Sequence, residues 1–203
     1  MLTKVNYPEE WEPMEENENL KLVQVLKDTK EYNDIHNEIS KTVPNPNILK
    51  IERVQNKWLW KCYLNRKKLL REKGVEENEK WLFHGTRTTQ PEQIYNGEFG
   101  FDTRHSNAGS YGVGIYFAVN ASYSKPGYCY RNKDGSLSFF YVKVALGDTI
   151  AINPNPAIRI PPEKPKKNNF AVERYDSVNG GNQMYIVYEN SRAYPHYYIT
   201  FVN

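Results

Sequence analysis

The sequence Gly-Ser-Tyr-Gly-Val-Gly-Ile-Tyr-Phe-Ala occupies residues 109–118 and joins a glycine-rich loop to a short apolar segment. Three glycines within residues 109–114 permit a tight turn, because glycine adopts backbone conformations that are closed to other residues. Tyr116-Phe117-Ala118 then predicts a strand that leaves this turn. The glycine spacing matches neither the dinucleotide-binding fingerprint nor the phosphate-binding lysine motif. A glycine turn beside core aromatic residues explains the segment as well as a ligand-binding loop does.

A second motif, Phe83-His84-Gly85-Thr86, lies upstream, where the predicted strand Trp81-Leu82-Phe83 ends. A histidine at a strand end, followed by glycine, can offer an imidazole and an unobstructed backbone to one ligand. A lone histidine is more often structural. The motif by itself therefore leaves both a structural and a ligand-binding role open.

The part of the chain after Asn78 has the alternation of strands. In Phe139 to Leu146, every second residue is apolar and shares one face: Phe140, Val142, Val144 and Leu146. Two more strands are predicted at Met184–Tyr188 and Tyr197–Val202, joined by a turn around Asn190 and Pro195.

The earlier part of the chain is predicted to be mostly helical. Lys30 to Lys41 places Tyr32, Ile35 and Ile39 at helical spacing, and Pro44 and Pro46 end that helix. A second helix is predicted from Val54 to a closing Gly74. Its expected apolar face holds Val54, Trp58, Cys62 and Leu69, with Leu59 and Tyr63 beside it. Two short strands are predicted at Val23–Leu26 and Ile48–Arg53.

These elements predict an α+β fold, with N-terminal helices packed on a largely antiparallel sheet, because helices precede many strands without a regular strand–helix alternation. A length of 203 residues fits one domain, residues 1–203. The chain also suits a module taken from a longer protein. A proline- and lysine-rich loop, Asn153 to Asn169, interrupts the strands, and loops of that length are usually functional or disordered.

Composition excludes several classes of protein. A net charge of +3, from 27 basic and 24 acidic residues, is too balanced to indicate nucleic-acid binding. Cys62 and Cys129 have no metal-ligand spacing and suggest no disulfide framework, which favours a reducing intracellular compartment, cytoplasm or nucleus. The sequence has no apolar run of membrane-spanning length, and residues 1–19 do not resemble a signal peptide. We expect neither a membrane partner nor a bound metal.

The motifs together resemble the poly(ADP-ribose) polymerase family, within the diphtheria-toxin-like ADP-ribosyltransferases. The resemblance is nearest to small members attached to macrodomains or zinc fingers, which transfer single ADP-ribose units. It runs from Tyr7-Pro8 to Phe201 and implies the ADP-ribosyltransferase fold with its split sheet. The segments that carry it are Ile51-Glu52-Arg53-Val54-Gln55-Asn56, His84-Gly85-Thr86, the glycine loop with Tyr116-Phe117-Ala118, Ala121-Ser122-Tyr123-Ser124 and Ala193-Tyr194-Pro195.

The resemblance implies NAD as co-substrate and assigns four residues to its nicotinamide end. The backbone of Gly85 would pair with the carboxamide, and the Ser124 hydroxyl would donate to the carboxamide oxygen. Tyr116 and Tyr128 would hold the ring between them. Two neighbouring tyrosines compete with Tyr128 for this role: Tyr123 and Tyr130.

The resemblance implies that the His84-Gly85-Thr86 motif binds the adenosine half of NAD. His84 would bind a ribose hydroxyl and, with Thr86, hold the adenosine half. The segment from Asn96 to Ser110 would form a loop that closes over the dinucleotide.

Met184 departs from the pattern of family members that build chains of ADP-ribose, which carry a glutamate just before a Tyr-Ile-Val-Tyr-like strand. Here Met184 precedes Tyr185-Ile186-Val187-Tyr188. A carboxylate would polarise an acceptor hydroxyl and stabilise a cationic sugar, and a thioether does neither. Gln183 and Glu189 lie at odd offsets from Met184, so on a regular strand both face away from it.

Three functions remain from different classes. The first is a mono-ADP-ribosyltransferase, expected to be a monomer, which modifies a protein or a nucleic-acid end. The second is an inactive NAD-like or RNA-associated binding module, and a purely structural interaction domain is a third alternative. Retention of His84, Gly85, Tyr116 and Ser124 favours the enzyme. Lys164, Lys166 and Lys167 either attract an acidic acceptor or form a solvated basic loop.

Overall fold

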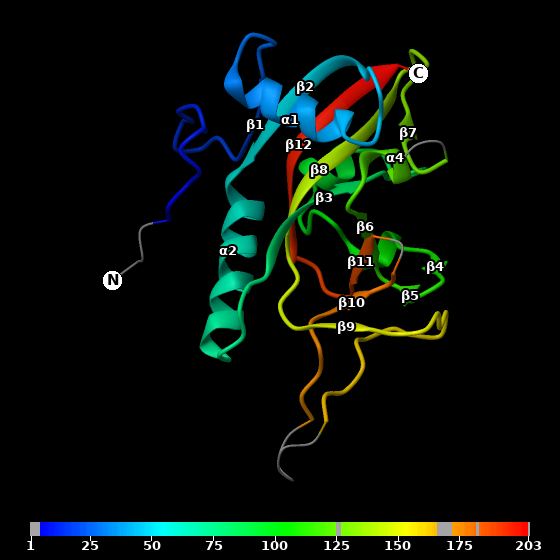
Figure 1. The fold of residues 1–203 in the computed structure, drawn as a ribbon. Helices are drawn as coiled ribbons and strands as arrows, with labels where there is room; N and C mark the ends of the chain where they lie inside the picture. Colours follow the sequence, from blue (N-terminus) through cyan, green and yellow to red (C-terminus); the bar gives the residue numbers. More distant parts are fainter. Residues whose placement is uncertain (1–4, 125–126, 166–171, 182, 203) are drawn as a thin grey trace.

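The computed structural model describes residues 5–124, 127–165, 172–181 and 183–202, and Figure 1 shows their arrangement. The larger sheet has ten strands. Nine of them form one path, in this order: β1 (Leu20–Gln24), β2 (Asn47–Asn56), β12 (Ala193–Val202), β8 (Leu137–Ala145), β3 (Glu79–His84), β6 (Ile115–Ala118), β11 (Met184–Val187), β10 (Ser177–Asn179) and β9 (Thr149–Ala151). The tenth, β7 (Tyr130–Arg131), pairs with β8. A separate hairpin consists of β4 (Ala108–Gly109) and β5 (Gly112–Val113).

The sheet is divided between β3 and β6. These two strands are joined by the single residue pair Phe83 and Ala118, whereas β3 pairs with β8 along its whole length. Neighbouring strands are antiparallel except β9 and β10, which are parallel. The prediction of an α+β fold with a largely antiparallel split sheet is therefore confirmed.

The helices are α1 (Lys30–Ser40), α2 (Lys57–Glu72), α3 (Glu92–Tyr95), α4 (Ala121–Ser124) and the 3₁₀ helix η1 (Thr103–His105). Strand β8 separates the two sides of the core. Phe139 packs with α1, while Phe140 and Val142 pack on the opposite face with α3 and β6. Ala145, on the same face as Phe139, packs with α2. The predicted alternation of β8 and the predicted buried face of α1 (Tyr32, Ile35 and Ile39) are confirmed.

The predicted start of the second helix is wrong. Val54 belongs to β2, where it pairs with Leu22 of β1. The helix begins only after Asn56, whose side chain accepts a hydrogen bond from the Leu59 amide at 3.0 Å and thus caps the helix. The longer strand also corrects the predicted end at Arg53. Strand β1 likewise ends at Gln24, before the predicted Leu26.

The predicted apolar face of α2 is wrong at Trp58 and Leu69, while Leu59 and Tyr63, expected beside that face, are buried. Its buried residues are Leu59, Trp60, Tyr63 and Leu70. Trp58 is 51% exposed and Leu69 is 38% exposed. Positions 59, 63, 66 and 70 lie on the packed side of the helix. Because position 66 is the charged Arg66, a pattern of apolar residues does not reveal this side. Arg66 forms an ion pair with Glu189.

Pro195 does not lie in a turn, as predicted, but within β12. The β12–β8 register shifts between Tyr194 and Tyr197. Proline has no backbone N–H to donate, so it is accommodated where the ladder is irregular. The turn that precedes β12 is centred on Asn190 and Ser191, and Ser191 has a positive φ of 65°.

The long loop after β9 packs against the glycine-rich segment in its described part. The Ile158 carbonyl accepts a hydrogen bond from the Val113 amide at 3.0 Å. A Cβ at Gly112 would lie 1.9 Å from that carbonyl oxygen, so only glycine fits. Lys164 forms an ion pair with Asp148, which argues against a free basic side chain there. Lys166 and Lys167, like the end of the predicted loop at Asn169, lie outside the described residues.

Candidate active site

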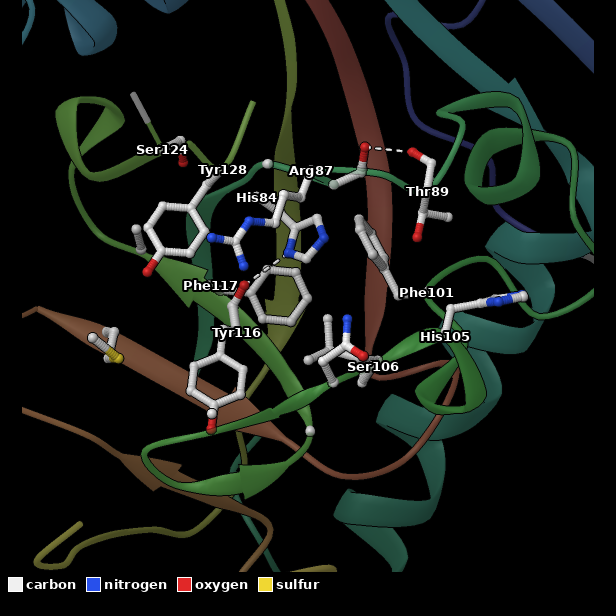
Figure 2. A pocket seen from close by; sticks show the side chains of 18 of the residues that line it. His84, Arg87, Thr89, Phe101, His105, Ser106, Tyr116, Phe117, Ser124 and Tyr128 are labelled. Atoms are coloured by element: carbon white, nitrogen blue, oxygen red, sulfur yellow. Dashed lines mark hydrogen bonds between the residues drawn. The ribbon is translucent and has the colours of Figure 1, made fainter. Parts of the chain in front are cut away.

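A pocket of about 320 Å³ lies at the division of the sheet, between the end of β3 and β6. Figure 2 shows side chains from β3, β6, α4 and η1 around it. The pocket brings together all the site residues predicted from the sequence: His84, Gly85, Thr86, Tyr116, Ser124, Tyr128 and Met184. One wall comes from residues 101, 102 and 105–110, within the predicted loop Asn96–Ser110.

His84 ends β3 and is held by the backbone of β6. Its Nδ1 lies 2.7 Å from the Tyr116 carbonyl oxygen. Because a carbonyl oxygen only accepts, Nδ1 carries the proton and Nε2 is left as an acceptor. The rings of Phe101 and Phe117 lie 4.9 and 5.3 Å away. Burial among them lowers the pKa of His84 to about 4, so the imidazole is neutral near pH 7.

Gly85 is required by a close approach of two backbones. A Cβ at this position would lie 2.3 Å from the Tyr128 carbonyl oxygen. The Arg87 amide donates to that same oxygen at 2.8 Å. The segment after β3 is thus fixed to the chain at Tyr128, and the motif has a structural reason for glycine beside any ligand role.

The next residue, Thr86, is buried, and its hydroxyl donates to the Thr89 carbonyl at 2.6 Å. Its proton therefore serves the turn. Ser124 is also buried, at the end of α4, and its carbonyl accepts from the Cys129 thiol at 2.9 Å. Both side chains line the pocket, and Figure 2 shows Ser124 near Tyr128.

Tyr116 is held rigidly by the glycine-rich segment. Its hydroxyl donates to the Gly112 carbonyl and accepts from the Tyr111 amide, both at 2.9 Å. The ring lies so near Gly109 that a Cβ there would be 2.7 Å from it. The β4–β5 hairpin and the Tyr116 side chain therefore hold each other in place. The ring presents a fixed apolar surface to the pocket.

Tyr128 is more loosely held, with 46% of its surface exposed. Its ring is stacked on Tyr123, with centroids 5.7 Å apart and planes inclined by 14°. The Arg87 guanidinium also lies 5.3 Å from the Tyr128 ring centre. Of the two tyrosines that compete with Tyr128, Tyr123 lines the pocket, while Tyr130 lies on β7 outside the lining.

Met184 begins β11 opposite Ala118 and is buried in the wall of the pocket. The two neighbours weighed as substitutes for a glutamate, Gln183 and Glu189, do not line the pocket. Gln183 has a positive φ of 61° and hydrogen-bonds Asn120. Glu189 bonds Arg192 at 2.8 Å. The structure therefore places both residues outside the pocket, in line with the expectation that they face away from Met184.

The sequence analysis missed two charged residues of the pocket, Arg87 and Asp102. Asp102 is the sole carboxylate among the described lining residues, and Arg104 binds it at 2.5 Å. That ion pair holds the pKa of the Asp102 carboxyl below its usual range. Arg87 directly follows the His84-Gly85-Thr86 motif, and this adjacency was the signal that it also lines the pocket.

Among the described residues, no three His, Cys, Asp or Glu side chains gather closely enough to hold a metal ion. A separate property is that none of the helices in these residues has the length and apolarity needed to cross a membrane.

Comparison with known proteins gives a consistent result. The family model of the poly(ADP-ribose) polymerase catalytic domain matches residues 29–169. A probable poly [ADP-ribose] polymerase of Dictyostelium discoideum is 36% identical over 205 residues, which cover 96% of this chain and 57% of that protein. The human protein mono-ADP-ribosyltransferase PARP14 is 34% identical over 98% of this chain and 11% of its own length. Human PARP11, of the same printed description, is 30% identical over 96% and 63%. The chain thus spans less than two thirds of each of these relatives.

Proposed function

Because the chain belongs to the poly(ADP-ribose) polymerase catalytic-domain family, we propose that it is a mono-ADP-ribosyltransferase. It binds NAD, releases nicotinamide and transfers one ADP-ribose unit to an acceptor. One observation carries this proposal: a single pocket joins His84, Gly85, Tyr116 and Ser124, while Met184 stands where chain-building relatives carry a glutamate. The printed names of PARP14 and PARP11 support transfer to a protein.

The nicotinamide end of NAD binds between α4 and β6. The Gly85 backbone pairs with the carboxamide, and the Ser124 hydroxyl donates to the carboxamide oxygen. Tyr116 stacks on the ring from its fixed position under the β4–β5 hairpin. Tyr128 supplies the second ring surface, and its stacking on Tyr123 must then loosen.

The adenosine half binds on the His84 side of the pocket. The Nε2 atom of His84 accepts a hydrogen bond from a ribose hydroxyl, because the Tyr116 carbonyl takes the Nδ1 proton. The Thr86 hydroxyl oxygen retains acceptor capacity while its proton serves Thr89. The wall between Phe101 and Ser110 closes over the dinucleotide.

The arrangement of these pocket residues suits the reaction. The bond between the ribose and the nicotinamide nitrogen breaks, its electron pair leaves with nicotinamide, and an acceptor atom bonds to the same ribose carbon. The transition state resembles an oxocarbenium ion and the leaving group is neutral, so the protein needs no strong nucleophile. Its task is to orient NAD, hold the departing ring and expose one face of the sugar.

Met184 limits the reaction to acceptors that need no activation. A thioether is a weak acceptor and polarises a hydroxyl poorly. A carboxylate or phosphate acceptor arrives with its own negative charge and reacts without such help. We therefore favour protein carboxylates as acceptors, with nucleic-acid terminal phosphates as a second class. A monomer that acts in the cytoplasm or nucleus completes the proposal.

Met184 also favours the second candidate, a binding module that has lost activity. Incubation with NAD labelled in its adenine half separates the two. The enzyme transfers label to a protein or nucleic-acid acceptor and releases nicotinamide in equal amount. A folded protein that binds NAD and does neither, with a panel of acceptors, is the binding module.

Thermal unfolding tests the nicotinamide site without any acceptor. A ligand that binds only the folded state raises the melting temperature, so nicotinamide at high concentration should do so. Tyr116→Ala should reduce the shift, because ring stacking contributes about 0.5–1.5 kcal/mol beyond area burial. Tyr130→Ala is the control, since Tyr130 lies outside the pocket lining. An equal shift in wild type and a folded Tyr116→Ala variant would refute the stacking assignment.

A further inference from the structure

The charges that line the pocket are few and uneven. Among the described lining residues, Arg87 is the sole lysine or arginine. The single carboxylate, Asp102, is already neutralised by Arg104. Both phosphates of NAD are ionised at neutral pH, and transfer of such charges from water into a pocket is costly without a partner. Arg87 is the side chain able to provide one.

The backbone of Arg87 is fixed while most of its guanidinium is not. Its amide donates to the Tyr128 carbonyl at 2.8 Å and its Nε donates to the Gly127 carbonyl at 2.9 Å. Its φ of 58° lies in the left-handed region, which disfavours residues other than glycine. Within the described residues, neither Nη1 nor Nη2 has a hydrogen-bond or ion-pair partner. These nitrogens carry the donors that bind a phosphate.

The position of the guanidinium fits the middle of a dinucleotide. Figure 2 shows Arg87 projecting into the pocket on the side of Tyr128, with His84 nearby. Under the proposed function, nicotinamide lies at Tyr116 and Tyr128 and the adenosine half lies at His84. The pyrophosphate joins those two halves, so it must pass between these residues.

We propose that Arg87 binds the pyrophosphate of NAD. In the absence of NAD its guanidinium rests on the Tyr128 ring, at 5.3 Å from the ring centre. Binding draws the guanidinium to the phosphates and leaves that ring available to nicotinamide. This inference rests on the proposed function, because it assumes that the pocket binds NAD.

The competing explanation is that Arg87 only holds the segment around Tyr128 in place. Two ligands separate these roles. Nicotinamide has no phosphate and occupies only the ring site, whereas ADP-ribose has the pyrophosphate and lacks nicotinamide. A holding role would affect both ligands, while a phosphate contact affects ADP-ribose alone.

The experiment measures the Kd of both ligands by calorimetry for wild type, Arg87→Gln and Arg87→Lys. The control is Arg131→Gln, which removes an exposed cation on β7 outside the pocket lining. We expect Arg87→Gln to bind ADP-ribose at least about tenfold more weakly and nicotinamide within about threefold of wild type. Arg87→Lys should recover part of the loss, because lysine keeps the charge without the planar fork. Added salt should weaken ADP-ribose binding more in wild type than in Arg87→Gln.

Equal losses for both ligands would overturn the inference in favour of the holding role. An unchanged Kd for ADP-ribose in Arg87→Gln would also overturn it. These two outcomes leave the proposed function intact. Failure of the folded wild type to bind either ligand would instead refute the proposed function, and this inference with it.

Discussion

His84 acts on two parts of the molecule through its two ring nitrogens. Nδ1 donates to the Tyr116 carbonyl and so connects β3 to β6. Nε2 is left as an acceptor in the pocket. Phe101 and Phe117 disfavour the charged imidazolium, so this arrangement persists at pH values where an exposed histidine would be protonated. The structural contact through Nδ1 is therefore compatible with the ligand contact that we propose for Nε2.

The pH dependence of stability tests the neutral state of His84. Its pKa is about 4 in the folded protein and 6.5 in an unperturbed histidine, so the unfolded chain takes up the proton first as the pH falls. The stabilisation is complete above pH 6.5 and is lost progressively down to pH 4. We expect the unfolding free energy of wild type to fall between pH 7 and pH 5 by about 1–2 kcal/mol more than that of His84→Gln. Urea unfolding at both pH values measures this.

The variant supplies its own control, because all other titrating groups, including buried His196, are common to both proteins. Parallel pH profiles of wild type and His84→Gln would show that His84 is not kept neutral by burial. Loss of NAD binding by His84→Gln at pH 7, with the fold retained, is expected in the same preparation.

Met184 predicts the length of the product. Elongation requires a hydroxyl of an attached ADP-ribose to attack a second NAD, and a hydroxyl is a poor nucleophile near pH 7 without a base. The sole carboxylate of the described lining, Asp102, is bound by Arg104. We expect products with single ADP-ribose units and no ladder on a gel at high NAD. Long polymers made by the unmodified protein would contradict this account of Met184.

At the scale of the elements, the strands were easier to predict than the faces of α2. Alternation predicted most of β8, as Phe139 to Leu146 against the observed Leu137–Ala145, and the face of Phe140, Val142 and Val144, although its other face is largely buried as well. In α2 apolar residues occur on several sides, and Arg66 interrupts the stripe that packs on the sheet. The cap at Asn56 fixes where the helix begins, and the ion pair of Arg66 with Glu189 shows how a charged residue is accommodated on the packed face. Glu189 is distant in sequence, so no local pattern predicts this ion pair.

In the candidate site, too, some features were predictable from the sequence and others were not. The motifs of the resemblance predicted which residues meet in the pocket: His84 and Met184 lie at strand ends, Tyr116 follows the glycine-rich segment, and Ser124 ends α4. The pairing of Tyr128 with Tyr123 depends on the path of a loop, and no local pattern encodes it. The position of Pro195 within β12 could not be predicted either, because the register shift that accommodates it depends on the pairing with β8.

Two tryptophans of α2 test the corrected helix face. Trp60 is buried and its ring lies 5.0 Å from that of Tyr194. Trp58 is half exposed, and its indole N–H donates to the Glu98 carbonyl at 2.9 Å. Trp60→Ala should lower the unfolding free energy by about 3–5 kcal/mol, as for other buried large side chains. Trp58→Ala should cost about 1 kcal/mol, the scale of one hydrogen bond. Equal losses in urea unfolding would restore the face expected from the sequence.

At the scale of the whole molecule, the pocket lies on the weakest connection of the sheet. Strands β3 and β6 share one residue pair, supported by the hydrogen bond from His84 to the Tyr116 carbonyl. Side chains reinforce this connection, since Leu82 of β3 and Phe117 of β6 share one apolar cluster. A ligand that contacts Gly85 on one side and Tyr116 on the other therefore links the two parts of the sheet.

Hydrogen exchange tests this consequence of the split sheet. Amides that open in smaller cooperative units exchange before those of the most stable core. Without ligand, we expect the amides of β6 and β11 to exchange faster than those of β8, whose neighbours β3 and β12 pair along much of its length. Saturating nicotinamide should slow exchange in β6 and β11.

Strand β1, at the far edge of the sheet, serves as the control, and its exchange rates should remain unchanged when nicotinamide is added. Equal protection of β6 and β8 in the free protein would mean that the sheet opens as one unit and that the division has no energetic consequence.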